Sequence, residues 1–137
     1  MQIQTFLLAT KVTRLPGNRY DAESAGLHSL AFPPESSFPV RFTLPALMVL
    51  RRETASEGAP FSLLFDLVDE DGRSIGQPRR LRAQGVFPAG PRFFYFPTQI
   101  TFEFPSPGSY RLDITTDEGL TGDVYSYGIE ITQPRKP

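Results

Sequence analysis

Apolar and polar residues alternate along most of this chain, in stretches separated by turn residues. The clearest stretch is 39–52, where the apolar residues of one parity are Val40, Phe42, Leu44, Ala46, Met48 and Leu50. Because successive side chains of a strand point to opposite faces, this pattern predicts a strand with one buried face. Pro45 interrupts it and cannot donate a ladder hydrogen bond, so we expect a sheet edge, a bulge or a break there.

The same alternation recurs in six or seven further stretches. They are 1–12, 27–32, 61–68, 80–87, 94–104, 110–115 and 125–131. The stretch 27–32 is compatible with a short strand or an irregular crossing. Regularly spaced short strands are typical of two-sheet sandwiches. We therefore predict an all-β, antiparallel two-sheet β-sandwich of seven or eight strands, immunoglobulin-like in the broad sense. Residues 1–133 form its single domain, and 134–137 form a frayed tail.

The amino-acid composition excludes several kinds of catalytic and metal site. The 137 residues include 12 Phe, 5 Tyr, no Cys and one His, which excludes disulfides, thiolate nucleophiles and a two-His metal site. A net charge of −1 argues against a nucleic-acid partner, and we expect no cofactor. No basic leader or 20-residue apolar run is visible, so we expect a cytoplasmic protein without a membrane contact. Arginine far outnumbers lysine, which suggests a bacterial source.

Three segments carry a resemblance to a known family. They are TFLLA at 5–9, LVDEDG at 67–72 and PGSYRL at 107–112. In this order they resemble an uncharacterised bacterial family of small single-domain β-sandwich proteins, classed as a domain of unknown function. The resemblance implies the fold and a bacterial source, and it transfers no catalytic residues.

Acidic residues cluster in two turns. Asp69 and Asp71 belong to the first turn, and Asp117 and Asp123 flank the second. Calcium prefers six to eight oxygen ligands, often from loop carboxylates, so the two turns could bind it if they met at one end of the fold. Hairpin turn chemistry explains the same Asp-Gly and Glu-Gly pairs without a metal, and we favour that interpretation.

His28 is the only histidine. With Ser24 or Ser29 and an aspartate it could be written as a catalytic triad, whose members meet in space rather than in sequence. As the one histidine of the chain, it has no second histidine with which it could bind a metal. A structural or exposed histidine is the favoured interpretation, and we predict that the protein is not an enzyme.

The aromatic run 93–96 is unusually dense. Alternation sends Phe94 and Phe96 to one face and Phe93 and Tyr95 to the other. If the core takes the first pair, the second pair is either exposed or covered by another segment such as 19–37. An exposed pair could stack on a sugar ring or anchor a protein partner.

Charge is segregated along the chain. Segment 73–92 contains five Arg and no acidic residue, whereas 103–130 contains six acidic residues and one Arg. Such surfaces can drive self-association, or they can pair within one molecule. Arg80 and Arg82 are the contact candidates in the basic segment.

We therefore predict a non-enzymatic protein-interaction or structural module that contacts another protein or itself. Its candidate contact residues are Phe93, Tyr95, Arg80 and Arg82. The alternative is a small-ligand module that binds carbohydrate through the aromatic residues or calcium through the acidic turns.

Overall fold

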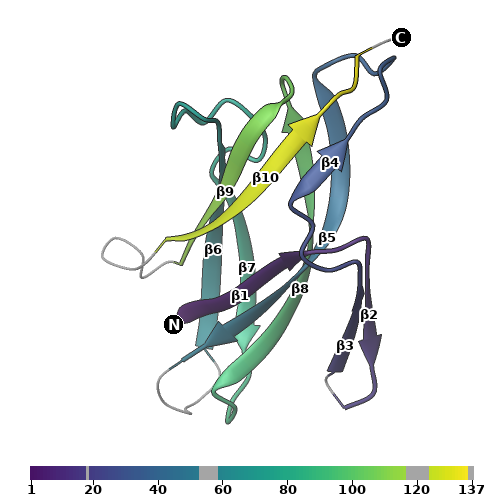
Figure 1. Ribbon diagram of the computed structural model, residues 1–137. Coiled ribbons are helices and arrows are strands. Elements are labelled where there is room, and N and C mark those ends of the chain that lie inside the picture. Colours follow the sequence, from purple (N-terminus) through teal and green to yellow (C-terminus); the bar gives the residue numbers. More distant parts are fainter. Residues whose placement is uncertain (18, 53–58, 117–123, 136–137) are drawn as a thin grey trace.

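The computed structural model describes residues 1–17, 19–52, 59–116 and 124–135, which form ten β-strands and no helix (Figure 1). The strands are β1 (Gln2–Leu8), β2 (Lys11–Leu15), β3 (Arg19–Glu23), β4 (Ser29–Ala31), β5 (Val40–Arg51), β6 (Ala59–Val68), β7 (Leu81–Phe87), β8 (Phe93–Phe104), β9 (Gly108–Thr116) and β10 (Tyr125–Thr132). The all-β prediction is confirmed. Nothing in the described ranges is a helix long and apolar enough to cross a membrane.

The ten strands form three sheets rather than two. One sheet has the order β1-β5-β8, the second has the order β4-β10-β9-β6-β7, and β2 pairs with β3 alone. The prediction of seven or eight strands in two sheets is therefore not confirmed. The prediction of antiparallel pairing holds at every described pair of strands except β4 with β10, which is parallel.

The additional elements lie in the N-terminal region, where the alternation is weakest. The stretch 1–12 is not one strand, because the chain leaves the first sheet at the fully buried Ala9 and turns back as the β2–β3 hairpin. Gly17, with φ +79°, lies in the turn of that hairpin. The stretch 27–32 contains the short strand β4, whose backbone follows β10 through the bonds of Glu130 N to His28 O and Phe32 N to Thr132 O.

The inner faces of the two larger sheets contact each other through aromatic rings. Phe6 of β1 lies 6.4 Å from Phe65 of β6 and 5.2 Å from Tyr127 of β10, measured between ring centroids. Phe61 of β6 lies 5.3 Å from Phe96 of β8. The predicted inner face of β5 is observed in its second half, where the buried residues are Leu44, Ala46, Met48 and Leu50.

Pro45 does not mark an edge or a break, because β5 is the central strand of its sheet. The ladder between β1 and β5 ends at Leu8 opposite Ala46, and Ala9 N then donates to Pro45 O. The missing N–H of Pro45 therefore faces the side on which β1 has already ended. The strand tolerates proline at this one position without losing a ladder bond.

Gly85 of β7 provides the space in which two core rings meet. A Cβ at this position would lie 2.6 Å from Phe61 Cζ and 3.1 Å from Phe96 Cε1. We expect Gly85→Ala to lower the free energy of unfolding by about 1–3 kcal/mol, because the packed rings cannot move aside freely. Urea denaturation followed by circular dichroism measures this change.

Gly128 of β10 offers a matched control, because a Cβ there meets nothing within 4 Å. Gly128→Ala should change the free energy of unfolding by less than about 0.5 kcal/mol. Equal effects of the two substitutions would show that the space at Gly85 is not the reason for its glycine.

Candidate functional site

The aromatic run divides between the core and the surface as its alternation predicts. Phe94 and Phe96 of β8 face inwards and contact Phe61. Phe93 and Tyr95 face outwards and are 52% and 45% exposed. Two large aromatic side chains therefore stand two residues apart on the outer face of one strand.

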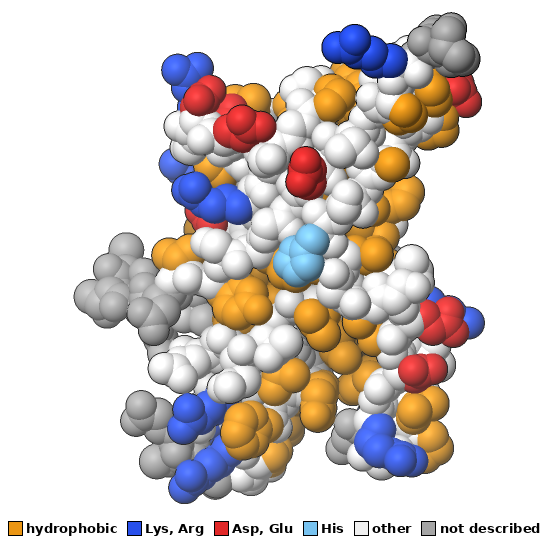
Figure 2. All heavy atoms as spheres, in the orientation of Figure 1, with side chains coloured by type: hydrophobic (Ala, Val, Ile, Leu, Met, Phe, Trp, Pro, Cys, Tyr) orange, Lys and Arg blue, Asp and Glu red, His pale blue; other side chains and the backbone are white. Residues whose placement is uncertain are grey.

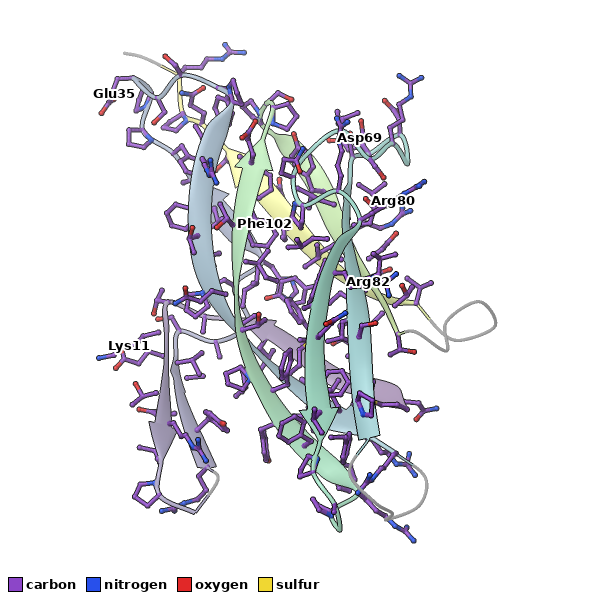
Figure 3. The ribbon with its side chains drawn as sticks, turned by 180° about the vertical axis from the view of Figure 1, so that it is seen from behind. Lys11, Glu35, Asp69, Arg80, Arg82 and Phe102 are labelled. Carbon is purple, nitrogen blue, oxygen red and sulfur yellow. The ribbon has the colours of Figure 1, made fainter. Side chains whose placement is uncertain are left out.

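The β2–β3 hairpin borders this aromatic pair. Tyr20 of β3 lies 6.0 Å from Tyr95 between ring centroids, with 43° between the ring planes. Segment 19–37, which was the candidate cover for this face, thus contacts it through Tyr20. Figure 3 shows the hairpin, which carries Lys11, standing beside the lower part of the first sheet.

A hollow of about 460 Å³ lies between the hairpin, the start of β8 and the turn before it. We call it the aromatic hollow, and its lining is Arg14, Tyr20, Pro88, Pro91, Phe93, Phe94, Tyr95 and Pro97. Rings and prolines dominate this lining, and both have few rotatable bonds. A ligand that enters the hollow therefore meets a stiff surface, which loses little conformational entropy on binding.

Arg52 fixes the turn from which Phe93 emerges. Its guanidinium donates to Pro88 O at 2.8 Å and to Pro91 O at 3.0 Å, and it lies 4.3 Å from the centre of the Phe87 ring. Its backbone N also donates to Arg92 O. Sequence analysis missed this residue, because these partners lie 35 to 40 positions away and no local pattern points to them.

Arg80 and Arg82 do not belong to the aromatic hollow. Arg82 lies on β7 of the second sheet, where its Nη1 donates to Ser62 Oγ at 3.1 Å. Arg80 precedes β7 with φ +51°. Figure 3 shows both arginines on the side of the molecule that carries β7. Phe93 and Tyr95 thus lie on β8 of the first sheet, whereas Arg82 lies on β7 of the second sheet and Arg80 directly before it.

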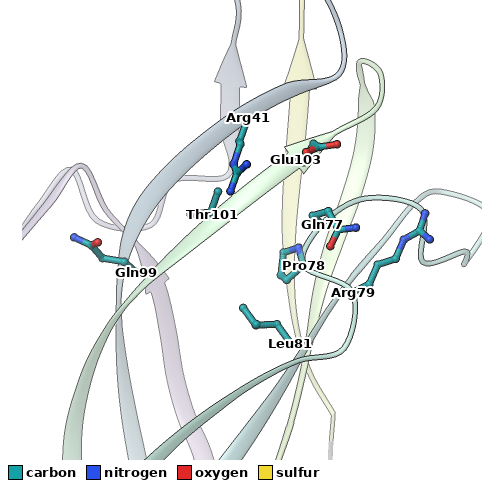
Figure 4. Close-up of a pocket in the computed structure, with 8 residues that line it drawn as sticks. All are labelled: Arg41, Gln77, Pro78, Arg79, Leu81, Gln99, Thr101 and Glu103. Atoms are coloured by element: carbon teal, nitrogen blue, oxygen red, sulfur yellow. The ribbon is translucent and has the colours of Figure 1, made fainter.

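A second hollow of about 520 Å³ lies on this flank, between β8 and the segment that leads into β7. We call it the flank groove, and Figure 4 shows its lining: Arg41, Gln77, Pro78, Arg79, Leu81, Gln99, Thr101 and Glu103. Most of these side chains are polar, and Leu81 is an apolar exception that is 47% exposed. The two hollows thus differ in chemical character.

The carboxylates of the first acidic turn have structural hydrogen bonds. Asp69 Oδ1 accepts from Asp71 N at 3.0 Å and from Arg73 N at 2.8 Å, and Glu70 Oε1 accepts from Ser109 N at 2.9 Å. This is the side-chain-to-backbone pattern of an Asx turn.

The remaining calcium candidates, Asp117 and Asp123, lie outside the described residues. Among the residues that the structure describes, no three His, Asp or Glu side chains are grouped as metal ligands.

His28 lies on the surface, where Figure 2 shows it as the only pale-blue side chain. Its Nδ1 donates to Gly128 O at 2.6 Å, and its ring stacks on Tyr127 with centroids 4.2 Å apart. Nδ1 therefore contacts a backbone carbonyl rather than the carboxylate that a triad requires. These contacts fit the interpretation of a structural surface histidine.

Comparison with known proteins adds little. No protein-family model matches the chain, and no curated protein matches it in sequence. A family 123 glycoside hydrolase from Clostridium perfringens, described for glycolipid glycan hydrolysis, is similar in structure with a TM-score of 0.39 and 14% identity. The alignment covers 82% of this chain and 24% of that chain, so this chain spans about a quarter of that protein's length. A likeness of this extent carries no argument about function.

Tyr127 allows a test of the packing beneath His28. Its hydroxyl donates to Leu27 O, and burial raises the pKa of its phenol above the ordinary value of 10.0. The folded state therefore keeps this proton after the unfolded chain has begun to lose it. The contribution of Tyr127 to the free energy of unfolding should be fully present well below pH 10 and should be lost as the pH rises through 10 and above.

Tyr127→Phe removes this titration together with the hydrogen bond. We expect it to lower the stability at pH 7 by about 1 kcal/mol, and to reduce the additional loss between pH 9 and pH 11. Chemical denaturation across this pH range measures both effects. An identical alkaline loss in wild type and variant would contradict the assignment to Tyr127.

Proposed function

We propose that this protein is a non-enzymatic binding module, built on a β-sandwich that is immunoglobulin-like in the broad sense. Its contact surface is the aromatic hollow, and its partner is another protein or a second copy of the chain. The observation that supports this most is the exposure of Phe93 and Tyr95, at 52% and 45%, beside Tyr20. Exposed aromatic clusters on a rigid surface are typical of the energetic centres of protein interfaces.

The contacts that hold the residues of the aromatic hollow in place support the same proposal. Arg52 holds the turn that precedes Phe93 through two carbonyls and a ring contact. Tyr95 is held from the inner side of β8 by the packing of its neighbours Phe94 and Phe96. A surface that is positioned before binding loses less entropy on association, and this raises affinity without additional contacts.

Carbohydrate binding is the second candidate function, and one observation favours it. Tyr20 and Tyr95 line the same hollow with rings 6.0 Å apart and inclined at 43°. Tyrosine combines an apolar ring with a polar hydroxyl, so such a pair can stack on the apolar face of a sugar while bonding to its hydroxyls.

The protein-binding proposal is tested by photo-crosslinking. A photo-reactive phenylalanine at position 95 should give a defined adduct with a protein from the source cells or with a second copy. The same probe at position 86 is the control, because Val86 is 61% exposed but lies on β7. Adducts of equal yield from both positions would contradict the proposal.

Once the partner of the adduct is purified, its affinity can be measured by calorimetry. Truncation of both Phe93 and Tyr95 to Thr should weaken binding by about 2 kcal/mol or more, which is roughly thirtyfold. Val86→Thr should leave the affinity unchanged. Unchanged affinity in the double variant would exclude the hollow as the contact surface.

The carbohydrate candidate is tested by titrating soluble oligosaccharides and recording backbone amide spectra. Saturable shifts confined to residues of the hollow, abolished by Tyr95→Thr and retained in Val86→Thr, would favour it over the protein partner. Shifts that are scattered over the surface, or that persist in Tyr95→Thr, would exclude it.

A further inference from the structure

The side of β8 that faces away from β5 is almost free of backbone partners. β8 lies at the end of the order β1-β5-β8, so only one of its sides has a full ladder. On the other side, the described residues supply one bridge, in which Gln77 and Glu103 exchange two backbone hydrogen bonds of 3.0 Å. The backbone between Phe93 and Thr101 has no ladder partner on this side within the described ranges.

The bridge also shows which backbone groups face this free side. In an antiparallel ladder, the N–H and C=O of one residue point the same way, and the direction alternates along the strand. Because Glu103 points towards Gln77, the groups of Thr101 and Gln99 and the C=O of Pro97 point to the free side as well. Pro45 supports this assignment, since it lies opposite Gln99 and its C=O faces β1.

The flank groove lies along this same stretch of β8. Gln99, Thr101 and Glu103 form its wall on β8, and Gln77, Pro78 and Leu81 form the facing wall (Figure 4). The groove therefore combines unpaired backbone groups with an apolar side chain, the 47% exposed Leu81. An extended peptide supplies what both features lack, namely backbone partners and side chains that alternate between groove and solvent.

The charge of the groove identifies the kind of peptide. Arg41 and Arg79 line it, against the single carboxylate of Glu103, and Arg80 follows Arg79 in the chain. Two copies that paired through this edge would bring their arginines together, which disfavours self-association at this flank. An acidic segment would instead be attracted to Arg41 on β5 and to Arg79, which precedes β7.

We propose that the free edge of β8 from Pro97 to Thr101 binds an extended, acidic segment of a partner protein by strand addition. The edge offers two N–H donors, from Gln99 and Thr101, and three C=O acceptors, from these residues and Pro97. Pro97 limits the added strand at one end, and the Gln77–Glu103 bridge limits it at the other. This inference does not rest on the aromatic hollow, whose residues Phe93 and Tyr95 are not part of the groove.

The experiment uses the full chain and a synthetic probe, acetyl-Glu-Val-Glu-Val-Glu-Val-amide. Its dissociation constant should be about 1 mM or tighter at low salt and should rise with added salt. In hydrogen exchange followed by NMR, the probe should slow exchange at the amides of Gln99 and Thr101. The Lys-Val counterpart should bind at least fivefold more weakly. A Glu-Val peptide should not bind when methyl groups replace the N–H hydrogens of the residues that would pair with β8.

A charge-matched pair of variants tests the arginines. The double variant Arg41→Gln and Arg79→Gln should weaken binding of the probe roughly tenfold. The double variant Lys11→Gln and Arg19→Gln removes the same charge from the β2–β3 hairpin and should leave binding unchanged. Equal weakening of probe binding in the two double variants would show that the effect depends only on net charge, and this would overturn the proposal.

Three further outcomes would overturn it. The first is absence of binding of the Glu-Val probe at several millimolar, and the second is binding without slowed exchange at Gln99 and Thr101. The third is a dimer in light scattering that protects the same two amides in the absence of peptide, which would assign the edge to a second copy. The first two results do not bear on crosslinking at position 95, so this inference and the proposed function can fail separately.

Discussion

The packing of phenylalanine rings between the two larger sheets is the constraint on which the surfaces of this protein depend. Phe61 reaches across to Phe94 and Phe96, and Gly85 leaves the space in which these rings meet. This contact commits the even-numbered side chains of β8 to the core. Because a strand alternates its faces, Phe93 and Tyr95 must then point outwards. The exposed aromatic pair is thus a consequence of core packing and would be lost if β8 shifted by one residue.

β8 also carries both candidate interaction surfaces, and different contacts fix its two ends. At its start, Arg52 binds the carbonyls of the preceding turn. Near its end, Gln77 exchanges two backbone hydrogen bonds with Glu103. The outer face of the strand offers side chains in the aromatic hollow, while its free edge offers backbone groups in the flank groove. One strand therefore presents two surfaces of different chemistry, a face and an edge, which meet at Pro97.

The sequence predicts the parts of this arrangement that depend on local alternation. The inner face of β5 beyond Leu44 and the division of the run 93–96 both follow from period-two patterns. The β2–β3 hairpin was missed because its residues alternate too weakly to show where the chain leaves the first sheet. Arg80 and Arg82 were grouped with the aromatic pair, although sheet pairing places Arg82 on β7 and Arg80 directly before it. Such separations depend on strand order, which no local pattern encodes.

The free edge of β8 raises the question of why it is not protected against aggregation. Natural edge strands are shielded by proline, by charged side chains or by a covering segment, and all three occur on or beside β8. Pro97 removes one donor, Arg41 and Arg79 supply like charge, and Gln77 covers Glu103. These devices leave the backbone groups of Gln99 and Thr101 uncovered, directly beside a groove with an exposed leucine. If protection against aggregation were the only constraint, we would expect the backbone of Gln99 and Thr101 to be covered as well. Our proposal that an acidic strand binds here requires instead that these groups stay accessible, with Arg41 and Arg79 nearby.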